Sequence, residues 1–408
     1  MIKASTLALY ICIVGLAGYP LLASVTNILP ISNNLASIVM RSSVAVASLI
    51  LFAVNFRGLL AKPIGWVPTL AAIFWVAYFA RILSDTLLTP GTLAFPPDYY
   101  LVWSVGGSFL PMLALASWDP KAAEMHKAFQ VLYVTFLAAG ILLVLSVFVA
   151  ELPRERDPSR FRLASLNPIA VGQLGVTIMI LTLWAMIYSP RKSVWGSALF
   201  AMGGVLGLLV AIISNSKGPL VAAAACAVFL FLSPSVRRKS RYLLAVALVA
   251  ESVIPIAIIL ENSFGFATYS RIFSQSLLDD SGVLARIDLY RDAIESFLRS
   301  PWLGAGLENP GQGYPHNVVI EAFMAVGVFG GLAFLLMLLL LAAKALASWK
   351  HMATHGWAVL LFIQYAVAAQ FSGALYSVVY FWLLVGLMMA LPAGGARDVG
   401  RAPERQPG

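Results

Sequence analysis

The chain is dominated by apolar runs of about 20 residues that alternate with short polar turns. That length matches the hydrocarbon core of a bilayer, where every spanning segment must satisfy its own backbone hydrogen bonds. With 60% of its 408 residues hydrophobic and only 11% charged, the chain has too few polar groups to cover a soluble domain. We therefore expect an all-α polytopic membrane protein.

We predict about twelve spans, all helical. Ser372-Gly373 could instead break one longer segment that contains the last two. The body would cover residues 1–391, with a long outer loop at 261–315, and the Gly/Pro/Arg-rich tail at 392–408 is predicted to be disordered and cytoplasmic. The predicted spans are 7–24, 36–54, 65–83, 99–117, 128–149, 168–188, 194–213, 218–233, 241–260, 316–343, 356–371 and 376–391.

Basic residues orient this bundle through the positive-inside rule. If both termini are cytoplasmic, most of the 27 Lys and Arg residues lie on the cytoplasmic side, and "SPSVRRKSR" at 233–241 is the densest group. The net charge of +9 therefore follows from topology and does not indicate nucleic acid as a partner. The sequence also lacks HExxH, CxxC and Walker motifs, so no metal or cofactor site is expected from motifs.

The cations left on the outer side are more informative, because the topology rule disfavours them. Lys217 lies in the very short turn of "IISNSKGPL", where it could hold a phosphate or simply snorkel to the interface. Arg41 and Arg81 lie within or at the outer ends of spans 2 and 3. Charges at such depths are costly and usually face a cavity or a partner.

The outer loop contains "SGVLARIDLYRDAIESFLRSP", which predicts an amphipathic helix between Ser281 and Pro301. Arg286 falls on one edge of its apolar face and could turn toward the membrane body, whereas Arg291 and Arg299 could form surface ion pairs. Such a helix would lie in the membrane interface. Its predicted apolar face is Val283, Leu284, Ile287, Tyr290, Ile294, Phe297 and Leu298, opposite Asp288, Asp292, Glu295 and Arg299.

The stretch "GYPHNVVIEAFMAVGVFGG", residues 313–331, places His316 at the edge of span 10. The other three histidines, His126, His351 and His355, fall on predicted cytoplasmic loops. The positive end of the helix dipole would favour a neutral imidazole, which a general base requires. The alternative is that His316 or Asn317 only caps the helix, although Glu321 comes one residue too late for a capping box on Asn317.

These features together resemble the O-antigen ligase and O-antigen polymerase family of bacterial envelope enzymes. The similarity is clearest over residues 281–334. It rests on Arg286 with the helix that follows, and on the P-x-x-G-x-G turn from Pro301 to Gly306. His316-Asn317, Glu321 and the G-x-x-G from Gly327 to Gly330 complete the pattern. The "SNSKG" turn is similar to the family's Ser-x-Ser-Arg-Gly turn, with Lys217 in place of arginine.

The resemblance implies an all-helical, C-type glycosyltransferase-like body with a large periplasmic loop in the bacterial inner membrane. It implies transfer of a glycan from undecaprenyl pyrophosphate to a hydroxyl of the lipid A core, or of another lipid-linked glycan in a polymerase, without a metal. His316 would then be the base, and Lys217 and Arg286 would hold the pyrophosphate. Arg41, Arg81, Asn317, Glu321 and Arg291 are further candidate substrate contacts.

Two interpretations from other classes stay open at this point. A transporter or flippase of a lipid-linked anion would need cations along both halves of its cavity, and the sequence shows no repeat symmetry. A non-catalytic assembly protein that keeps the family body is the third interpretation, favoured only by lysine at position 217.

Overall fold

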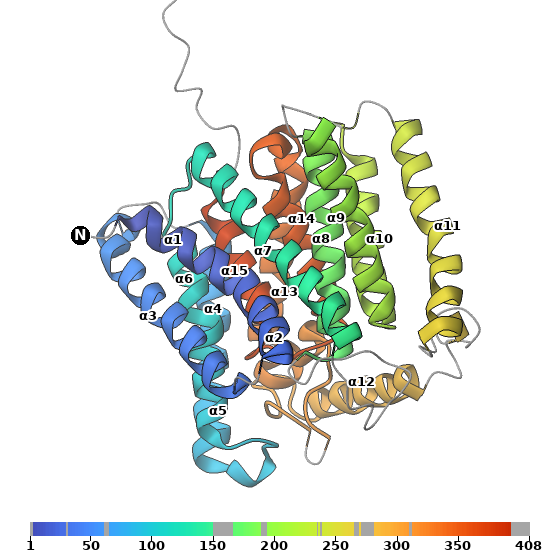
Figure 1. Ribbon diagram of the computed structural model, residues 1–408. Helices are drawn as coiled ribbons and strands as arrows, with labels where there is room; N and C mark the ends of the chain where they lie inside the picture. The colour runs from blue at the N-terminus through green and yellow to red at the C-terminus, as the bar shows by residue number, and fades with distance from the viewer. Residues whose placement is uncertain are drawn as a thin grey trace, which may run out of the picture.

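The computed structural model describes residues 3–29, 32–60, 65–149, 166–188, 194–234, 236, 239–264, 269–270, 281–309 and 312–392. Within these ranges the chain is mainly α-helical and forms no β-strand, so the all-α prediction is confirmed (Figure 1). The helices of the first half are α1 (Ala4–Ile13), α2 (Tyr19–Ile28), α3 (Asn33–Leu60), α4 (Trp66–Leu88), α5 (Pro97–Leu101), α6 (Leu110–Ala116) and α7 (Ala122–Val149). Those of the second half are α8 (Pro168–Tyr188), α9 (Val194–Ile213), α10 (Lys217–Leu232), α11 (Lys239–Phe264), α12 (Ser281–Arg299), α13 (Val318–Ala347), α14 (Met352–Ala368) and α15 (Val379–Ala390).

Each predicted span coincides with one of these helices or with a continuous helical segment. Two segments pass through a π-helical stretch, at Val14–Gly18 between α1 and α2 and at Val102–Phe109 between α5 and α6. Among the described residues, 7 helical segments are long and apolar enough to cross a membrane. The chain is therefore a multi-pass membrane protein, and the count of twelve spans stays a prediction. Residues 150–165 between the spans predicted at 128–149 and 168–188, residues 265–268, 271–280 and 310–311 of the predicted outer loop, and the tail from 393 lie outside the described residues.

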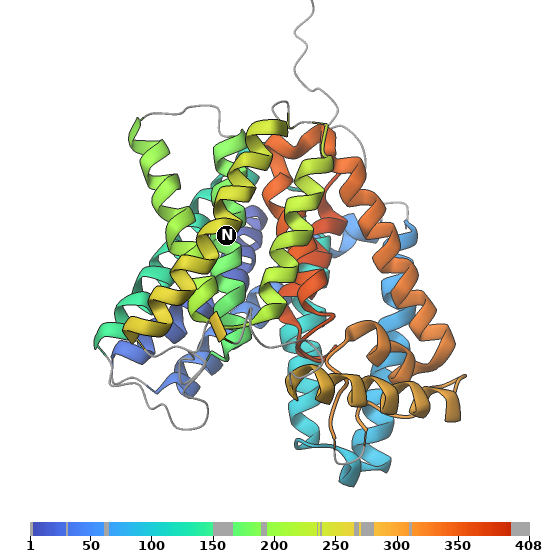
Figure 2. The same ribbon diagram turned by 90° about the vertical axis from the view of Figure 1, so that its right-hand side faces the viewer.

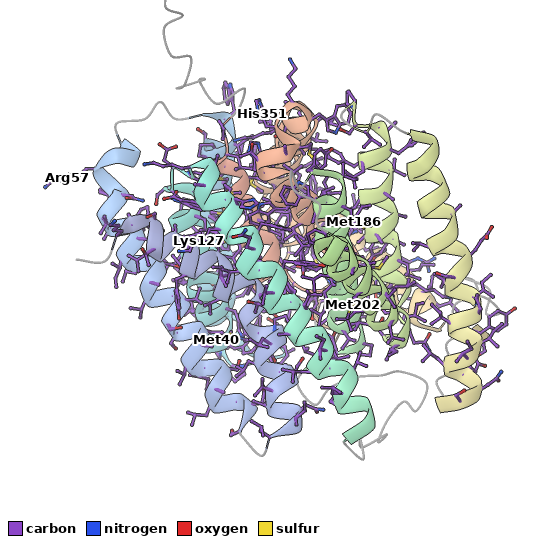
Figure 3. The ribbon with its side chains drawn as sticks, turned by 45° about the horizontal axis from the view of Figure 1, so that its top comes forward. Met40, Arg57, Lys127, Met186, Met202 and His351 are labelled. Atoms are coloured by element: carbon purple, nitrogen blue, oxygen red, sulfur yellow. The ribbon has the colours of Figure 1, made fainter. Side chains whose placement is uncertain are left out.

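One helix does not follow the direction of the bundle. In Figures 1 and 2, α12 runs across the lower end of the bundle, where it packs against α13. Figure 3 turns the opposite end toward the viewer, and Arg57, Lys127 and His351 lie at that end. The predicted cytoplasmic and outer groups of residues are thus separated along the bundle, with α12 on the predicted outer side.

One part of the core is built from aromatic side chains of α4, α13 and α15. The Trp382 ring lies 4.7 Å from Trp75, 5.7 Å from Phe74 and 5.9 Å from Phe334, measured between ring centroids. The indole Nε1 of Trp382 donates to the carbonyl of Leu375 at 2.8 Å. This cluster connects the three helices to the segment between α14 and α15, which forms part of the candidate site.

Helix α13 is interrupted at Gly327, where φ is +68°. The P-x-x-G-x-G turn fits into the break. The amide of Ala305 donates to the carbonyl of Met324 at 2.7 Å, and the amide of Val328 donates to the carbonyl of Pro301 at 2.7 Å. Backbone groups released by the break are thereby satisfied inside the membrane protein, as they must be where water is absent. These hydrogen bonds hold the start of the segment that leads from Pro301 to His316 and Asn317.

Candidate functional site at the end of α13

The junction between the outer loop and α13 is formed by His316 and Asn317. The side-chain oxygen of Asn317 accepts hydrogen bonds from the amides of Val319 and Ile320, both at 3.0 Å. Asn317 is therefore the N-cap, and α13 begins at Val318, two residues later than the predicted span. The cap alternative applies to Asn317, which leaves the imidazole of His316 available for another role.

His316 has an unusual backbone and a shielded ring. Its φ is +59°, in the left-handed region that non-glycine residues seldom occupy. Its ring meets the ring of Tyr314 edge-on at 4.5 Å between centroids. Burial lowers the pKa of the imidazole, and the positive charge of Arg286 lowers that pKa further. The ring is consequently neutral near pH 7 and can accept a proton.

Arg286 is half-buried on the side of α12 that bears the buried Ala293, an orientation that the helical wheel left open. Within the described residues its guanidinium makes one hydrogen bond, a long one of 3.5 Å from Nη1 to the carbonyl of Gly282. Tyr290, one turn further along, donates its hydroxyl to the carbonyl of Gln370 at 3.2 Å. The influence of Arg286 on the pKa values of both His316 and Tyr290 places its charge at this junction.

The turn after α14, residues 369–373, forms a shared wall of the site. Its Gln370 carbonyl accepts the Tyr290 hydroxyl and also the side-chain amide of Asn317, at 3.3 Å. The amide of Val318 donates to the carbonyl of Ala369 at 3.2 Å. The turn therefore contacts both α12 and the start of α13. Gly373, with φ +90°, lies in it, so the Ser-Gly break noted in the sequence is a turn between two helices.

Lys217 approaches the same turn from another side. It is the first residue of α10, which follows α9 after the buried residues Ser214, Asn215 and Ser216. A β-carbon added at Gly218 would lie 3.8 Å from the β-carbon of Phe371. Lys217 and His316 thus belong to segments that pack against one short turn, although they are 99 positions apart in sequence.

Glu321 is buried below this surface. Its Oε1 accepts the hydroxyl of Tyr78 at 3.2 Å, and its two oxygens accept the amide of Leu375 at 2.9 and 3.0 Å. The carboxylate therefore joins α4, α13 and the segment before α15. Its predicted contact with substrate stays a prediction, and the geometry gives it a supporting position.

Arg81 is likewise engaged by protein groups. Its Nε donates to the carbonyl of Ala325 at 2.8 Å, and Nη2 donates to the carbonyls of Leu303 and Gly304 at 2.7 and 2.9 Å. Nη1 bonds Asp85 at 3.2 Å, and the second carboxylate oxygen of Asp85 accepts the amide of Leu307 at 2.7 Å. This Arg-Asp pair attaches the P-x-x-G-x-G turn to α4.

Arg41 lines a cavity of about 280 Å³ that borders the 369–373 turn through Ala369 and Ser372. Its guanidinium lies over the rings of Trp103 and Tyr19, at 4.0 and 4.5 Å from their centroids. Most of the cavity lining is apolar, and Gln173 and Ser372 contribute polar groups. Among the described residues that line the cavity, Arg41 is the one with a positive charge. The described lining therefore lacks the cations along both halves that a transporter of a lipid-linked anion would need.

The two remaining arginines of α12 differ from Arg286. Arg291 is exposed, and Arg299 pairs with Glu295 at 3.5 Å on the surface, as the ion-pair alternative predicted. Three contributors to the site were not identified from sequence: Tyr290, Tyr314 and Gln370. Tyr290 had been assigned to the apolar face, although its hydroxyl was a signal for a polar contact. Burial, aided by the negative charge of Glu321, raises the pKa of Tyr314 to about 12, so its phenol stays protonated.

No group of three or more His, Cys, Asp or Glu side chains is gathered as a metal site among the described residues. The polar groups that do converge are the imidazole, the Arg286 guanidinium, the capping amide and the carbonyls of the 369–373 turn.

Comparison with known proteins agrees with these motifs. A family model described as O-Antigen ligase matches residues 202–335, a range that includes the Lys217 turn, α12 and His316. A protein named O-antigen ligase from Pseudomonas aeruginosa is 25% identical over 340 residues, which is 71% of this chain and 78% of the relative. The resemblance to the O-antigen ligase and polymerase family is therefore confirmed.

Proposed function

We propose that this chain, similar as it is to O-antigen ligases, transfers a glycan from undecaprenyl pyrophosphate to a hydroxyl of the lipid A core at the outer surface of the inner membrane. The observation that carries the proposal is that the start of α13, with His316, and the helix that bears Arg286 both contact the turn at 369–373, where the charge of Arg286 adds to burial in lowering the pKa of His316. Glycan transfer from a lipid pyrophosphate needs a proton acceptor and a cation at one place. The two comparisons, both to O-antigen ligases, favour the ligase over the polymerase.

The chemistry follows from those two groups. The acceptor hydroxyl attacks the anomeric carbon of the donor sugar while His316 takes the hydroxyl proton. The bond from that carbon to the pyrophosphate oxygen breaks, and the electron pair leaves with undecaprenyl pyrophosphate. A single displacement of this kind inverts the configuration at the anomeric carbon. No step requires a metal or an oxidant to balance atoms or charge.

Cations at the membrane surface stabilise the leaving group. The charge that develops on the pyrophosphate lies near Arg286, whose planar guanidinium can bind two phosphate oxygens at once. Lys217, on the other side of the 369–373 turn and at the positive end of α10, supplies a second charge. Fixed charges of this kind act mainly on the transition state and contribute strongly in a site with little water.

The test is genetic and biochemical. Deletion of the gene should remove long chains from the lipid A core while lipid-linked polymer accumulates, as seen on gels of surface glycans. Single repeat units left on the core would instead indicate a polymerase, and intact glycans would overturn the proposal. His316→Ala should behave as the deletion, since loss of a general base costs about 10²- to 10⁴-fold. His126→Ala, an exposed histidine at the opposite end of the bundle, is the matched control.

A further inference from the structure

Helix α12 exposes a second apolar surface that its contacts with the protein do not explain. On the protein side lie Ala293, which is fully buried, and Phe297, whose ring lies 5.6 Å from that of Phe323. The predicted apolar face is thus divided: Tyr290 and Phe297 pack inward and Val283 is half-buried, whereas the other four members are exposed. We name the outward group the α12 stripe: Leu284, Ile287, Ile294 and Leu298, which expose 44, 45, 46 and 66% of their surface.

The stripe is a narrow and regular feature of the helix. At about 100° per residue its four members fall within an arc of about 80°. The charged residues Asp288, Asp292, Glu295 and Arg299 occupy the next arc, on the side away from the protein-facing residues. The helix therefore has three surfaces: one against the protein, one apolar and open, and one charged.

The α12 stripe continues into the surface that faces lipid. Trp302 follows Leu298 by one turn and stacks on Phe329 of α13 at 5.9 Å between centroids, and both side chains are 66% exposed. Phe329 belongs to an outward row on a membrane-spanning helix, completed by Leu332, Leu336 and Leu339. A helix that lies across the end of the bundle and shares its apolar surface with a lipid-facing row is placed at the membrane boundary (Figures 1 and 2).

We propose that the α12 stripe is inserted in the outer leaflet of the bilayer, with lipid as its partner. Arg291 lies within the same arc, where its long side chain can reach the phosphates of lipid headgroups. The charged arc faces water. Arg286 lies on the protein-facing surface of α12. Contact of the stripe with lipid therefore fixes the rotation of α12 that directs Arg286 toward His316. The insertion itself does not depend on the proposed glycan transfer.

The test compares neighbouring positions on different surfaces of α12 in the full-length protein. Cys12 and Cys226 are buried and are first replaced by alanine. Single cysteines are then introduced as the matched pairs Ile287→Cys with Asp288→Cys and Leu298→Cys with Arg299→Cys, all at exposed positions. Each variant is labelled with the NBD fluorophore and reconstituted in phosphatidylethanolamine and phosphatidylglycerol vesicles.

Insertion predicts that the labels at 287 and 298 emit at shorter wavelength, are quenched by lipids with a doxyl group near the headgroup, and are protected from aqueous iodide. Labels at 288 and 299 should show the reverse order of quenching. Equal access of iodide to both members of a pair would overturn the proposal. A second outcome would also overturn the proposal. If the labels at 287 and 298 are protected from iodide but not quenched by doxyl lipids, and if this protection depends on the protein-to-lipid ratio, a second copy of the chain covers the stripe.

Discussion

The charge of Arg286 on α12 lowers the pKa of the His316 imidazole at the start of α13. The two residues are separated by a loop of which only part is helical, and they meet because both segments contact the turn at 369–373. A cation beside a base has two consequences at once. It keeps the base neutral, and it provides positive charge for an anionic leaving group.

Replacement of Arg286 by Gln should shift the pH dependence of glycan transfer. His316 must be neutral to accept a proton, so activity falls as pH drops through its pKa. Removing the neighbouring charge raises that pKa toward the ordinary value, so the acid limb of the rate profile should move to higher pH. The profile is measured with a purified lipid-linked donor. Arg299→Gln, which removes a surface charge paired with Glu295, should leave the limb in place. If the acid limb of Arg286→Gln is not shifted, the charge of Arg286 does not act on the pKa of His316.

Lys217 should be replaceable by arginine but not by alanine. Arg keeps the charge at the first residue of α10 and adds a planar pair of donors for phosphate. We expect Lys217→Arg to retain transfer and Lys217→Ala to lose about 10²-fold, the scale for removing one group that stabilises developing negative charge. Initial rates at saturating donor would measure this. Equal rates in the two variants would show that the positive charge at position 217 does not contribute to donor binding or transfer.

Asn317 should contribute to stability through its cap. Asn317→Asp keeps the oxygen that accepts from Val319 and Ile320, whereas Asn317→Ala removes it. We expect Ala to cost about 1 kcal/mol of folding free energy and Asp much less. Thermal unfolding in detergent, followed by intrinsic tryptophan fluorescence, would measure the difference. A lower melting temperature for Asp than for Ala would contradict the cap assignment.

Arg81 should act mainly through structure. Its substitution by Ala leaves Asp85 buried without its cation and frees three carbonyls at the break in α13. Loss of a buried partner of this kind costs about 3 kcal/mol. We expect Arg81→Ala to lower the melting temperature and the yield of folded protein, with activity per folded molecule reduced less than in His316→Ala. A variant of normal stability with no activity would instead favour direct contact between Arg81 and substrate.

Much of this fold could be predicted because a membrane imposes its own pattern. A segment that crosses lipid must be apolar and helical, so the position of each helix is encoded locally in runs of residues, and those positions agree with the structure. The same reasoning about charge predicted that α12 lies at the end of the bundle opposite Arg57, Lys127 and His351, which agrees with Figures 1 and 3. The helical wheel placed Arg286 on one edge of the apolar face of α12, away from its acidic residues, which left open that it could turn toward the protein.

Contacts between segments distant in sequence could not be predicted in this way. Apolar periodicity does not encode which turn packs on which, so the meeting of Tyr290 and Asn317 at the Gln370 carbonyl was not foreseen. Nor does an isolated arginine reveal its partner, and only the fold shows that Arg81 holds the turn within broken α13 while Arg41 lies over two aromatic rings. The sequence by itself determined that this chain spans a membrane with helices and carries His316 on one side of it. Tertiary structure decided which cation stands beside that histidine, because side chains from α12, α13 and the turn after α14 come together only when the helices pack.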